Sequence, residues 1–298
     1  MSYSIEHTPP HEGKRRLPAY LRKPQGNPEV LHRMKKILRE RGLHTVCESA
    51  RCPNIGECFS KPTATFMLLG EVCTRSCGFC GVEKKQGRIE KPSPDEPSAI
   101  ALAVKELGLK HVVVTSVTRD DLRYGGADEF AAVVRAVRES LPDVFIEVLT
   151  PDFRGDESAL NIVLESAPDI FNHNIETVER LYPAVRPEAL YSTSLEVLSK
   201  AKKSGVLTKS GLMLGLGEGK EEVKKVLKDL HGACVDCVTI GQYLRPTRAN
   251  LEVKGYVTPE GFEEYGEYAK DMGIKYVYSG PFVRSSYNAE EVFKIPSL

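Results

Sequence analysis

The chain has 298 residues, of which 41 are basic, 41 are acidic and 41% are apolar, enough for one large domain or two small ones. Its formal net charge of zero argues against a dedicated nucleic-acid-binding protein, because such proteins usually carry a basic excess. No apolar run approaches the roughly 20 residues that span a bilayer, and the N-terminal residues lack the apolar stretch of a secretory signal, so we expect a cytoplasmic protein that binds no membrane.

The first part of the chain is predicted to be an arm followed by a helical extension. Residues 1–28 are polar and punctuated by prolines, which favours an extended arm. From Pro28 to Arg41 apolar side chains recur at helical spacing, and Gly42 can serve as the C-cap. We assign residues 29–62 to an N-terminal extension that contains the first cysteine-rich stretch.

The middle of the chain, residues 63–274, alternates between strand and helix patterns. Most of its six apolar, β-rich runs are separated by helical patterns, which predicts βα units around a parallel sheet. Six units give a partial (β/α)6 barrel of the TIM type, and a doubly wound open sheet is the alternative that periodicity does not exclude. The runs are Ala64–Leu69, His111–Val117, Val144–Leu149, Asp169–His173, Leu207–Leu214 and Val235–Tyr243.

The last part of the chain begins with a helix predicted over Thr258–Met272. A short strand over Lys275–Tyr278 follows, and the remaining residues have no element of their own. We assign residues 275–298 to a C-terminal strand and tail, which we expect to close over the mouth of the barrel.

Cysteines are the most informative residues of the sequence. The chain has eight, and six of them fall between Cys47 and Cys80. Disulfides are rare in the cytosol, so clustered thiols there more often bind metal or carry out chemistry.

Three thiols, at Cys73, Cys77 and Cys80, form a C-x3-C-x2-C loop directly after the first predicted barrel strand. In a barrel this loop opens at the C-terminal mouth, where active sites lie. Iron–sulfur cubanes usually take four cysteines, so a loop with three leaves one iron open to an outside ligand. Structural zinc is the competing interpretation, but zinc sites favour paired C-x2–4-C units that give four ligands.

This loop resembles the signature of the radical SAM superfamily. The resemblance implies that S-adenosylmethionine (SAM) binds the open iron through its amino and carboxylate groups. An electron from the cluster then yields a 5′-deoxyadenosyl radical that can attack an unactivated C–H bond. Phe79 matches the aromatic position that lies beside the adenine in this superfamily.

A second triplet precedes the first, with C-x4-C-x5-C spacing at Cys47, Cys52 and Cys58. Two triplets suggest two clusters, and the alternative pools all six thiols in one polynuclear site. The different internal spacings, and the strand predicted between the triplets, disfavour a pooled site.

The two triplets in this order resemble the pattern of the lipoyl synthases. The resemblance covers about residues 30 to 290. Its further segments are Thr115–Asp121, Glu147–Phe153, His173–Thr177, Gly211–Glu218, Gly241–Pro246 and Gly280–Tyr287.

The resemblance implies a reaction and a set of partners. The family inserts two sulfur atoms at C6 and C8 of an octanoyl chain that is amide-linked to a lysine of a lipoyl carrier domain. Two 4Fe–4S clusters and SAM are implied as cofactors, the auxiliary cluster donating the sulfur. Expected partners are octanoylated 2-oxoacid dehydrogenase E2 subunits, the glycine cleavage H protein, an electron donor such as ferredoxin or flavodoxin, and cluster-assembly proteins.

The tail contains an R-S-S-Y segment that begins at Arg284. The family's second serine ligates the auxiliary cluster, so the resemblance gives this role to Ser286, with Arg284 orienting the cluster or substrate. The plain alternative is that Ser285 and Ser286 only make turn hydrogen bonds, as loop serines commonly do.

Other polar and glycine positions give weaker signals. Asp120 and Glu176 follow predicted strands and either contact SAM or cap the next element. Gly215 either eases a strand end beside SAM or allows close packing. The pair Cys234 and Cys237 suggests redox or metal work, but a strand over Val235–Ile240 puts the thiols on opposite faces, and Cys237 is best explained as a small buried residue.

Two other functions compete with lipoyl synthesis. A methylthiotransferase also carries an extra cluster, but such enzymes usually have separate flanking domains, for which this chain has no room. An iron–sulfur electron carrier needs no open iron, so release of 5′-deoxyadenosine from SAM distinguishes it.

Overall fold

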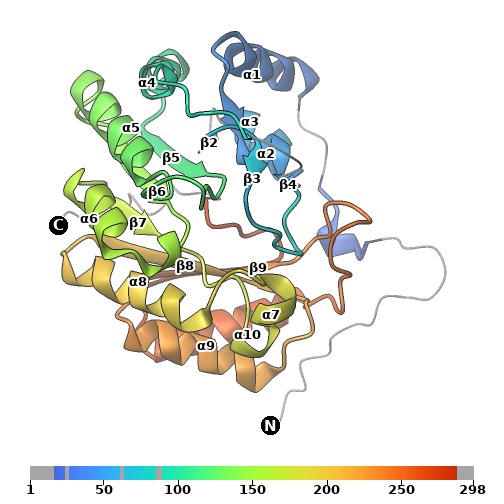
Figure 1. The fold of residues 1–298 in the computed structure, drawn as a ribbon. Helices are drawn as coiled ribbons and strands as arrows, with labels where there is room; N and C mark the ends of the chain where they lie inside the picture. The colour runs from blue at the N-terminus through green and yellow to red at the C-terminus, as the bar shows by residue number, and fades with distance from the viewer. Residues whose placement is uncertain (1–16, 24–26, 61–63, 85–88, 287–298) are drawn as a thin grey trace.

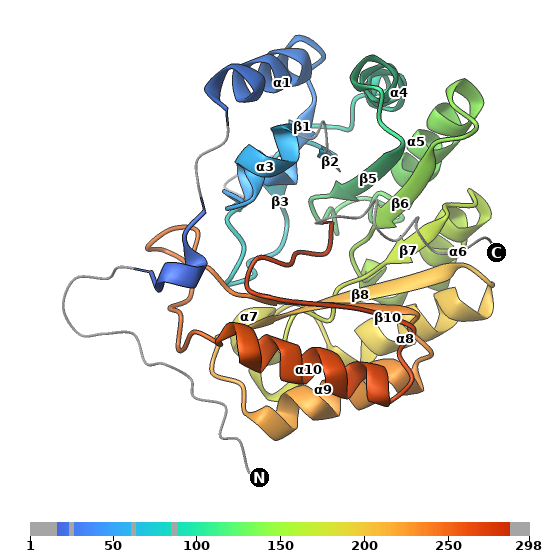
Figure 2. The ribbon, with the colours of Figure 1, turned by 180° about the vertical axis from the view of Figure 1, so that it is seen from behind.

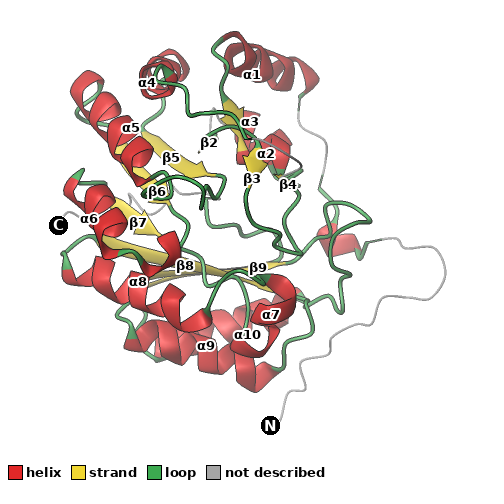
Figure 3. Cartoon of the chain, viewed as in Figure 1, coloured by secondary structure: helices red, strands yellow, loops and turns green. Residues whose placement is uncertain are grey.

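The computed structural model of the chain describes residues 17–23, 27–60, 64–84 and 89–286. Its main feature is a sheet of eight strands with helices along its outer face (Figure 1, Figure 3). In spatial order the strands are β1 (His44–Thr45), β2 (Thr65–Leu68), β5 (His111–Ser116), β6 (Phe145–Leu149), β7 (Ile170–Asn172), β8 (Leu207–Leu214), β9 (Cys237–Gln242) and β10 (Tyr276–Ser279).

The strand order distinguishes the two folds that the sequence left open. From β2 to β10 all neighbouring pairs are parallel and follow each other in space as in the chain, while β1 adds an antiparallel edge. A doubly wound sheet would reverse its order at a switch point. The partial barrel is therefore confirmed, and β10 extends it by one more parallel strand.

Helices connect the parallel strands and cover the outside of the barrel (Figure 2). In the last of them Thr258 caps the first turn by accepting from the Gly261 amide, and Phe262, Tyr265 and Ala269 form the buried face. No helix among the described residues has the length and apolar character needed to cross a bilayer. The helices are α4 (Glu96–Leu107), α5 (Ala127–Ser140), α6 (Glu157–Glu165), α7 (Tyr182–Val185), α8 (Tyr191–Lys203), α9 (Lys220–Gly232) and α10 (Pro259–Asp271), with 3-10 turns at Phe153–Gly155 and Glu179–Leu181.

The N-terminal extension packs beside the first barrel strand. Its main helix, α1 (Pro28–Glu40), confirms the predicted one: the Asn27 side chain caps it, and Gly42, with φ of +64°, follows its end. The predicted arm lies mostly outside the described residues, and of its described part Ala19–Leu21 forms a 3-10 turn rather than extended chain. The short elements that follow α1 are α2 (Val46–Ser49), α3 (Ile55–Ser60), and a two-stranded sheet of β3 (Val72–Cys73) and β4 (Glu83–Lys84).

The barrel interior contains a buried ion pair. Lys209 of β8 donates to Glu147 of β6 at 3.1 Å, and the Asn172 side chain donates to the same carboxylate at 2.7 Å. Burial of these charges is tolerated because they are paired and hydrogen-bonded. Cys237 is also buried, as predicted, whereas Cys234 does not lie on the strand: β9 begins at Cys237, and Cys234 is an exposed residue after α9 with φ of +59°.

Candidate functional site

The first triplet lies on one loop at the carboxyl end of β2. Cys73 ends the short strand β3, and Cys77 and Cys80 follow in the turn that leads to β4. The loop therefore occupies the place where a barrel presents its active-site residues, as the sequence predicted.

A buried arginine inside this loop ties it to two neighbouring strands. Arg75 donates to both oxygens of Asp120, at 2.8 and 3.0 Å, and to both oxygens of Asp152, at 2.6 and 2.8 Å. Burial alone would raise the pKa of Asp152, but the bonded Arg75 guanidinium lowers it to about 2. The cysteine loop is therefore held by two bidentate ion pairs.

Backbone contacts hold the other end of the loop. The Gly78 amide donates to the Val185 carbonyl at 2.9 Å, and the Leu251 amide donates to the Gly78 carbonyl at 2.9 Å. A Cβ on Gly78 would lie 2.8 Å from Leu251 Cγ, so the loop packs too closely against Leu251 to admit a side chain at Gly78. The Asn250 side chain adds a 2.7 Å bond to the Cys80 carbonyl.

The thiols of this loop suit a metal cluster. Burial raises the pKa of Cys77 to about 11 and that of Cys80 to about 12. The two sulfurs thus stay protonated at neutral pH unless a cation takes up the charge of the thiolate, as the irons of a cluster do. Together with Cys73 they give three sulfur donors on one loop, which fit a cubane that keeps one iron open.

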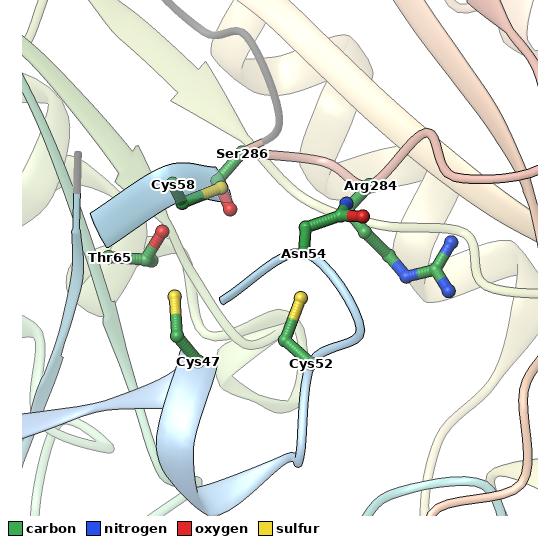
Figure 4. A pocket seen from close by; sticks show the side chains of 7 residues that line it. All are labelled: Cys47, Cys52, Asn54, Cys58, Thr65, Arg284 and Ser286. Atoms are coloured by element: carbon green, nitrogen blue, oxygen red, sulfur yellow. The ribbon is translucent and has the colours of Figure 1, made fainter. Parts of the chain in front are cut away.

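The second triplet lines a pocket between the extension and the tail (Figure 4). Cys47 comes from α2, Cys58 from α3 and Cys52 from the turn between them. In this view the Cys47 and Cys52 side chains point to the same side, toward the part of the pocket that Cys58 and Ser286 line. The pocket is lined by Cys47, Cys52, Asn54, Cys58, Thr65, Arg284 and Ser286.

This donor set also fits a cluster. Burial, with Cys52 nearby, raises the pKa of Cys47 to about 12, while hydrogen bonds from Thr65 act the other way. No three His, Cys, Asp or Glu side chains in the described part of the chain are grouped to hold a single metal ion. Three cysteines and one serine around a pocket offer four donors, the number that a cubane takes.

The tail reaches this pocket from the far end of the chain. The Gly280 amide donates to Ile240 at the end of β9, and the Asn54 side chain donates to the Phe282 carbonyl at 2.8 Å. A Cβ on Gly241 would lie 2.0 Å from the Val283 carbonyl oxygen, so only glycine lets the tail cross β9 here. The tail thus closes over the barrel mouth, and within the described residues it reaches Ser286, which lines the pocket of the second triplet.

Arg284 lines the same pocket, but its guanidinium points away from the cysteines (Figure 4). Burial lowers its pKa, and the nearby Cys52 acts in the opposite direction. Arg284 therefore places positive charge at the edge of a site that three thiolates would make negative. Tyr287, the last residue of the R-S-S-Y segment, lies outside the described residues.

The predicted SAM contacts have different surroundings. Phe79 is half-buried and packs near Leu216 and Tyr243. The Asp120 carboxylate is occupied by Arg75 and also contacts Arg154 at 3.3 Å, which makes it an anchor of the cysteine loop.

Gly215 is explained by close packing. Its φ is +105°, and a Cβ there would lie 2.2 Å from the Gln242 side-chain nitrogen and 2.5 Å from the Gly255 carbonyl oxygen. Glu176 is half-buried with a φ of +65°, a conformation that is costly outside glycine and often found at functional sites. Burial raises its pKa, partly offset by Arg186.

Sequence reasoning missed the residues that hold these sites in place. Arg75 lies between cysteines of the first triplet and Asn54 between cysteines of the second, and these positions could have marked them as residues that hold the sites. Asp152 follows a predicted strand within the resembling segment Glu147–Phe153, yet nothing local marks it as the partner of Arg75.

Comparisons with known proteins agree with this geometry. The sequence profile of the Radical SAM superfamily matches residues 67–230. The lipoyl synthase of Rubrobacter xylanophilus is 56% identical over 260 residues, which cover 87% of this chain and 80% of that protein. The lipoyl synthase of Alkaliphilus metalliredigens is 52% identical over 282 residues, which cover 94% of this chain and 97% of that protein.

Solved structures share the fold at low sequence identity. Methylornithine synthase (PylB) is similar with a TM-score of 0.53 at 16% identity, over 85% of this chain and 78% of that one. Streptococcus suis SuiB bound to S-adenosylmethionine gives a TM-score of 0.55 at 12% identity, over 76% of this chain and 53% of that one. At these identities the likenesses show the fold alone.

Proposed function

The chain belongs to the lipoyl synthase family of the radical SAM superfamily, and we propose that its two cysteine triplets hold two 4Fe–4S clusters with separate roles. It inserts two sulfur atoms at C6 and C8 of a protein-bound octanoyl-lysine, using SAM. When bound, the first cluster and SAM supply the radical that removes hydrogen from the octanoyl chain, and the second cluster supplies the sulfur.

At the radical site the chain's own task is to hold the cluster loop still. Cys73, Cys77 and Cys80 are the proposed ligands of three irons. Arg75 keeps their loop fixed through two carboxylates, and this rigidity matters because small misplacements of reacting groups cost large factors in rate. Glu176, strained and half-buried, is the proposed polar contact to SAM.

At the auxiliary site the chain supplies one ligand of a different kind. Cys47, Cys52 and Cys58 are the proposed thiolate ligands, and Ser286 is the proposed fourth ligand. A serine alkoxide is harder than thiolate, and its bond to iron is easier to lose, which suits a cluster that gives up sulfur. Arg284 offsets the negative charge of the site.

The observation that carries this proposal is the position of Ser286. The tail brings Ser286 into the lining of the pocket that the second triplet forms, and no fourth cysteine lines that pocket. This arrangement supports a cluster with three thiolates and one oxygen ligand at a place separate from the first triplet.

The proposed partners follow from the substrate. The enzyme acts on octanoylated lipoyl domains, and we propose those of 2-oxoacid dehydrogenase E2 subunits and the glycine cleavage H protein. Ferredoxin or flavodoxin is the proposed electron donor, and cluster-assembly proteins are the proposed source of new auxiliary clusters. The proposed location is the cytoplasm.

The test is anaerobic reconstitution followed by mass spectrometry of an octanoyl-lysine peptide. We expect about eight irons per chain, two cubane signals in the Mössbauer spectrum and a lipoyl-lysine product. One cubane only, or tightly bound zinc, would refute the two-cluster proposal.

A further inference from the structure

The tail contains a second serine, Ser285, that faces the barrel instead of the cysteine pocket. Arg284 and Ser286 line that pocket, whereas Ser285 does not. Its hydroxyl donates a 2.6 Å hydrogen bond to Asn174 Oδ1, on the segment that follows β7. The two serines therefore have different partners, and turn formation does not explain the contact of Ser285.

The contact between Ser285 and the barrel leaves no room for a side chain at the neighbouring Gly211. A Cβ on Gly211 of β8 would lie 2.7 Å from Ser285 Oγ and 2.9 Å from Asn174 Oδ1. Glycine at this position therefore leaves the space in which the serine hydroxyl and the amide meet. The Thr239 hydroxyl, 2.6 Å from the same Cβ position, closes the other side.

Asn174 extends this contact toward the first triplet. Its side-chain nitrogen donates to the Glu176 carboxylate at 3.1 Å, and its backbone carbonyl accepts from the Arg186 guanidinium at 3.1 Å. Arg186 in turn lies 3.9 Å from an oxygen of Asp152, the carboxylate that also holds Arg75 of the cysteine loop. A continuous polar path thus runs from the tail to the loop of the radical site.

The need for such an anchor follows from the position of Ser286. Ser286 follows Ser285 directly in the chain, so the contacts of the residues just before it bear on where its hydroxyl lies. The Phe282 carbonyl is held by Asn54 at 2.8 Å, and the next side-chain hydrogen bond along the tail that reaches another segment is that of Ser285.

We propose that Ser285 is a positioning residue for sulfur insertion. Its bond to Asn174 fixes the tail on the barrel so that the Ser286 hydroxyl faces the second triplet, and it ties the auxiliary site to the radical site. This inference rests on the proposed role of Ser286 as a cluster ligand.

The experiment compares three variants of the reconstituted enzyme. Ser285→Ala removes the hydroxyl, and Gly211→Ala displaces it sterically while leaving both serines in place. Ser279→Ala is the matched control, because it removes a serine hydroxyl bond of 2.6 Å to the Phe262 carbonyl a few residues upstream. The readouts are iron content, the Mössbauer signal of the oxygen-ligated iron, and the ratio of lipoyl product to 5′-deoxyadenosine.

We expect Ser285→Ala and Gly211→Ala to keep both clusters but to lower the product ratio roughly three- to tenfold, the range that one hydrogen bond represents. The oxygen-ligated iron signal should fall with it, and Ser279→Ala should match wild type. Wild-type values in the first two variants would overturn the inference, as would loss of both clusters from Ser285→Ala. The assignment of Ser286 as a cluster ligand has its own test: it fails if Ser286→Ala still makes the full amount of lipoyl product.

Discussion

The two cysteine triplets belong to parts of the molecule that are constructed differently. The first occupies eight consecutive positions of one loop, fastened to the barrel by the buried Arg75 and by backbone bonds. The second draws on α2, α3 and the tail, and the Asn54 side chain bonds a tail carbonyl that lies 228 residues away in the chain. One site is thus local and rigid, and the other is closed by a terminal segment.

This difference corresponds to the roles that we propose for the two sites. A cluster that is used repeatedly needs ligands that do not move, and two bidentate ion pairs provide that. A cluster that is consumed has to be opened and rebuilt. A ligand on a tail can leave its iron without disturbing the barrel. The auxiliary site can therefore open while the loop of the first triplet stays fixed.

The largest effects should come from the cysteines, and they should differ between the triplets. Cys73→Ala, Cys77→Ala and Cys80→Ala should each stop SAM cleavage, because the open-iron cluster loses a ligand. Cys47→Ala, Cys52→Ala and Cys58→Ala should keep SAM cleavage but form no lipoyl product. The measurement is chromatography of 5′-deoxyadenosine beside peptide mass spectrometry.

One result of that comparison would overturn the roles assigned to the two triplets. A first-triplet variant that still makes 5′-deoxyadenosine would show that the roles of the triplets are wrongly assigned. Cluster content should be measured on the same samples, so that lost activity is matched to the cluster that is missing.

Ser286→Ala should have the next largest effect. Both clusters should assemble and SAM cleavage should survive, because three thiolates remain at the auxiliary site, but dithiolane formation should be largely abolished. Mössbauer spectra should lose the oxygen-ligated iron. Full lipoyl product from this variant would remove Ser286 from the mechanism.

Arg75→Met tests whether the first site depends on its rigidity. Removal of the guanidinium leaves the buried Asp120 and Asp152 carboxylates without their partner, which costs roughly 3–5 kcal/mol. SAM cleavage should fall roughly a hundredfold even in molecules that retain iron, because the loop is no longer fixed. Urea unfolding and the EPR response of the cluster to SAM measure the two effects.

Arg180→Met is the matched control for this prediction. Arg180 also forms a bidentate pair, with Glu222 at 2.7 and 2.9 Å, but it lies on the exposed surface. Its loss should therefore leave stability and SAM cleavage near wild type. Equal behaviour of the two variants would show that burial of the Arg75 pairs does not matter.

Much of the fold could be predicted from the sequence because its elements are strongly patterned. The six barrel strands and the helices over Pro28–Glu40 and Pro259–Asp271 lie within two residues of their predicted bounds. The first triplet was equally clear, since all three thiols are local in sequence. Periodicity could not choose between barrel and open sheet, because strand order is set by packing between helices and sheet.

The parts that could not be predicted depend on long-range contacts. Arg75 pairs with Asp152, and Asn54 bonds to the tail. In both cases the local sequence of one partner carries no sign of the other. Ser286 came from family resemblance alone. Asp120 had two interpretations, a SAM contact or a cap, and neither of them included the ion pair that it forms with Arg75.

The smallest effects should come from the two cysteines outside the triplets. Cys234→Ser should change neither iron content nor product, because the thiol is exposed after α9, and such surface changes usually stay within about 0.5 kcal/mol. Cys237→Ser places a hydroxyl in the buried interior beside Lys209 and Glu147, where burial raises the pKa of the thiol to about 12 and keeps it neutral. Its cost should be about 1–2 kcal/mol of stability, with both clusters retained. Loss of a cluster from either variant would mean that this pair belongs to the iron sites, and the division into two triplets would have to be redrawn.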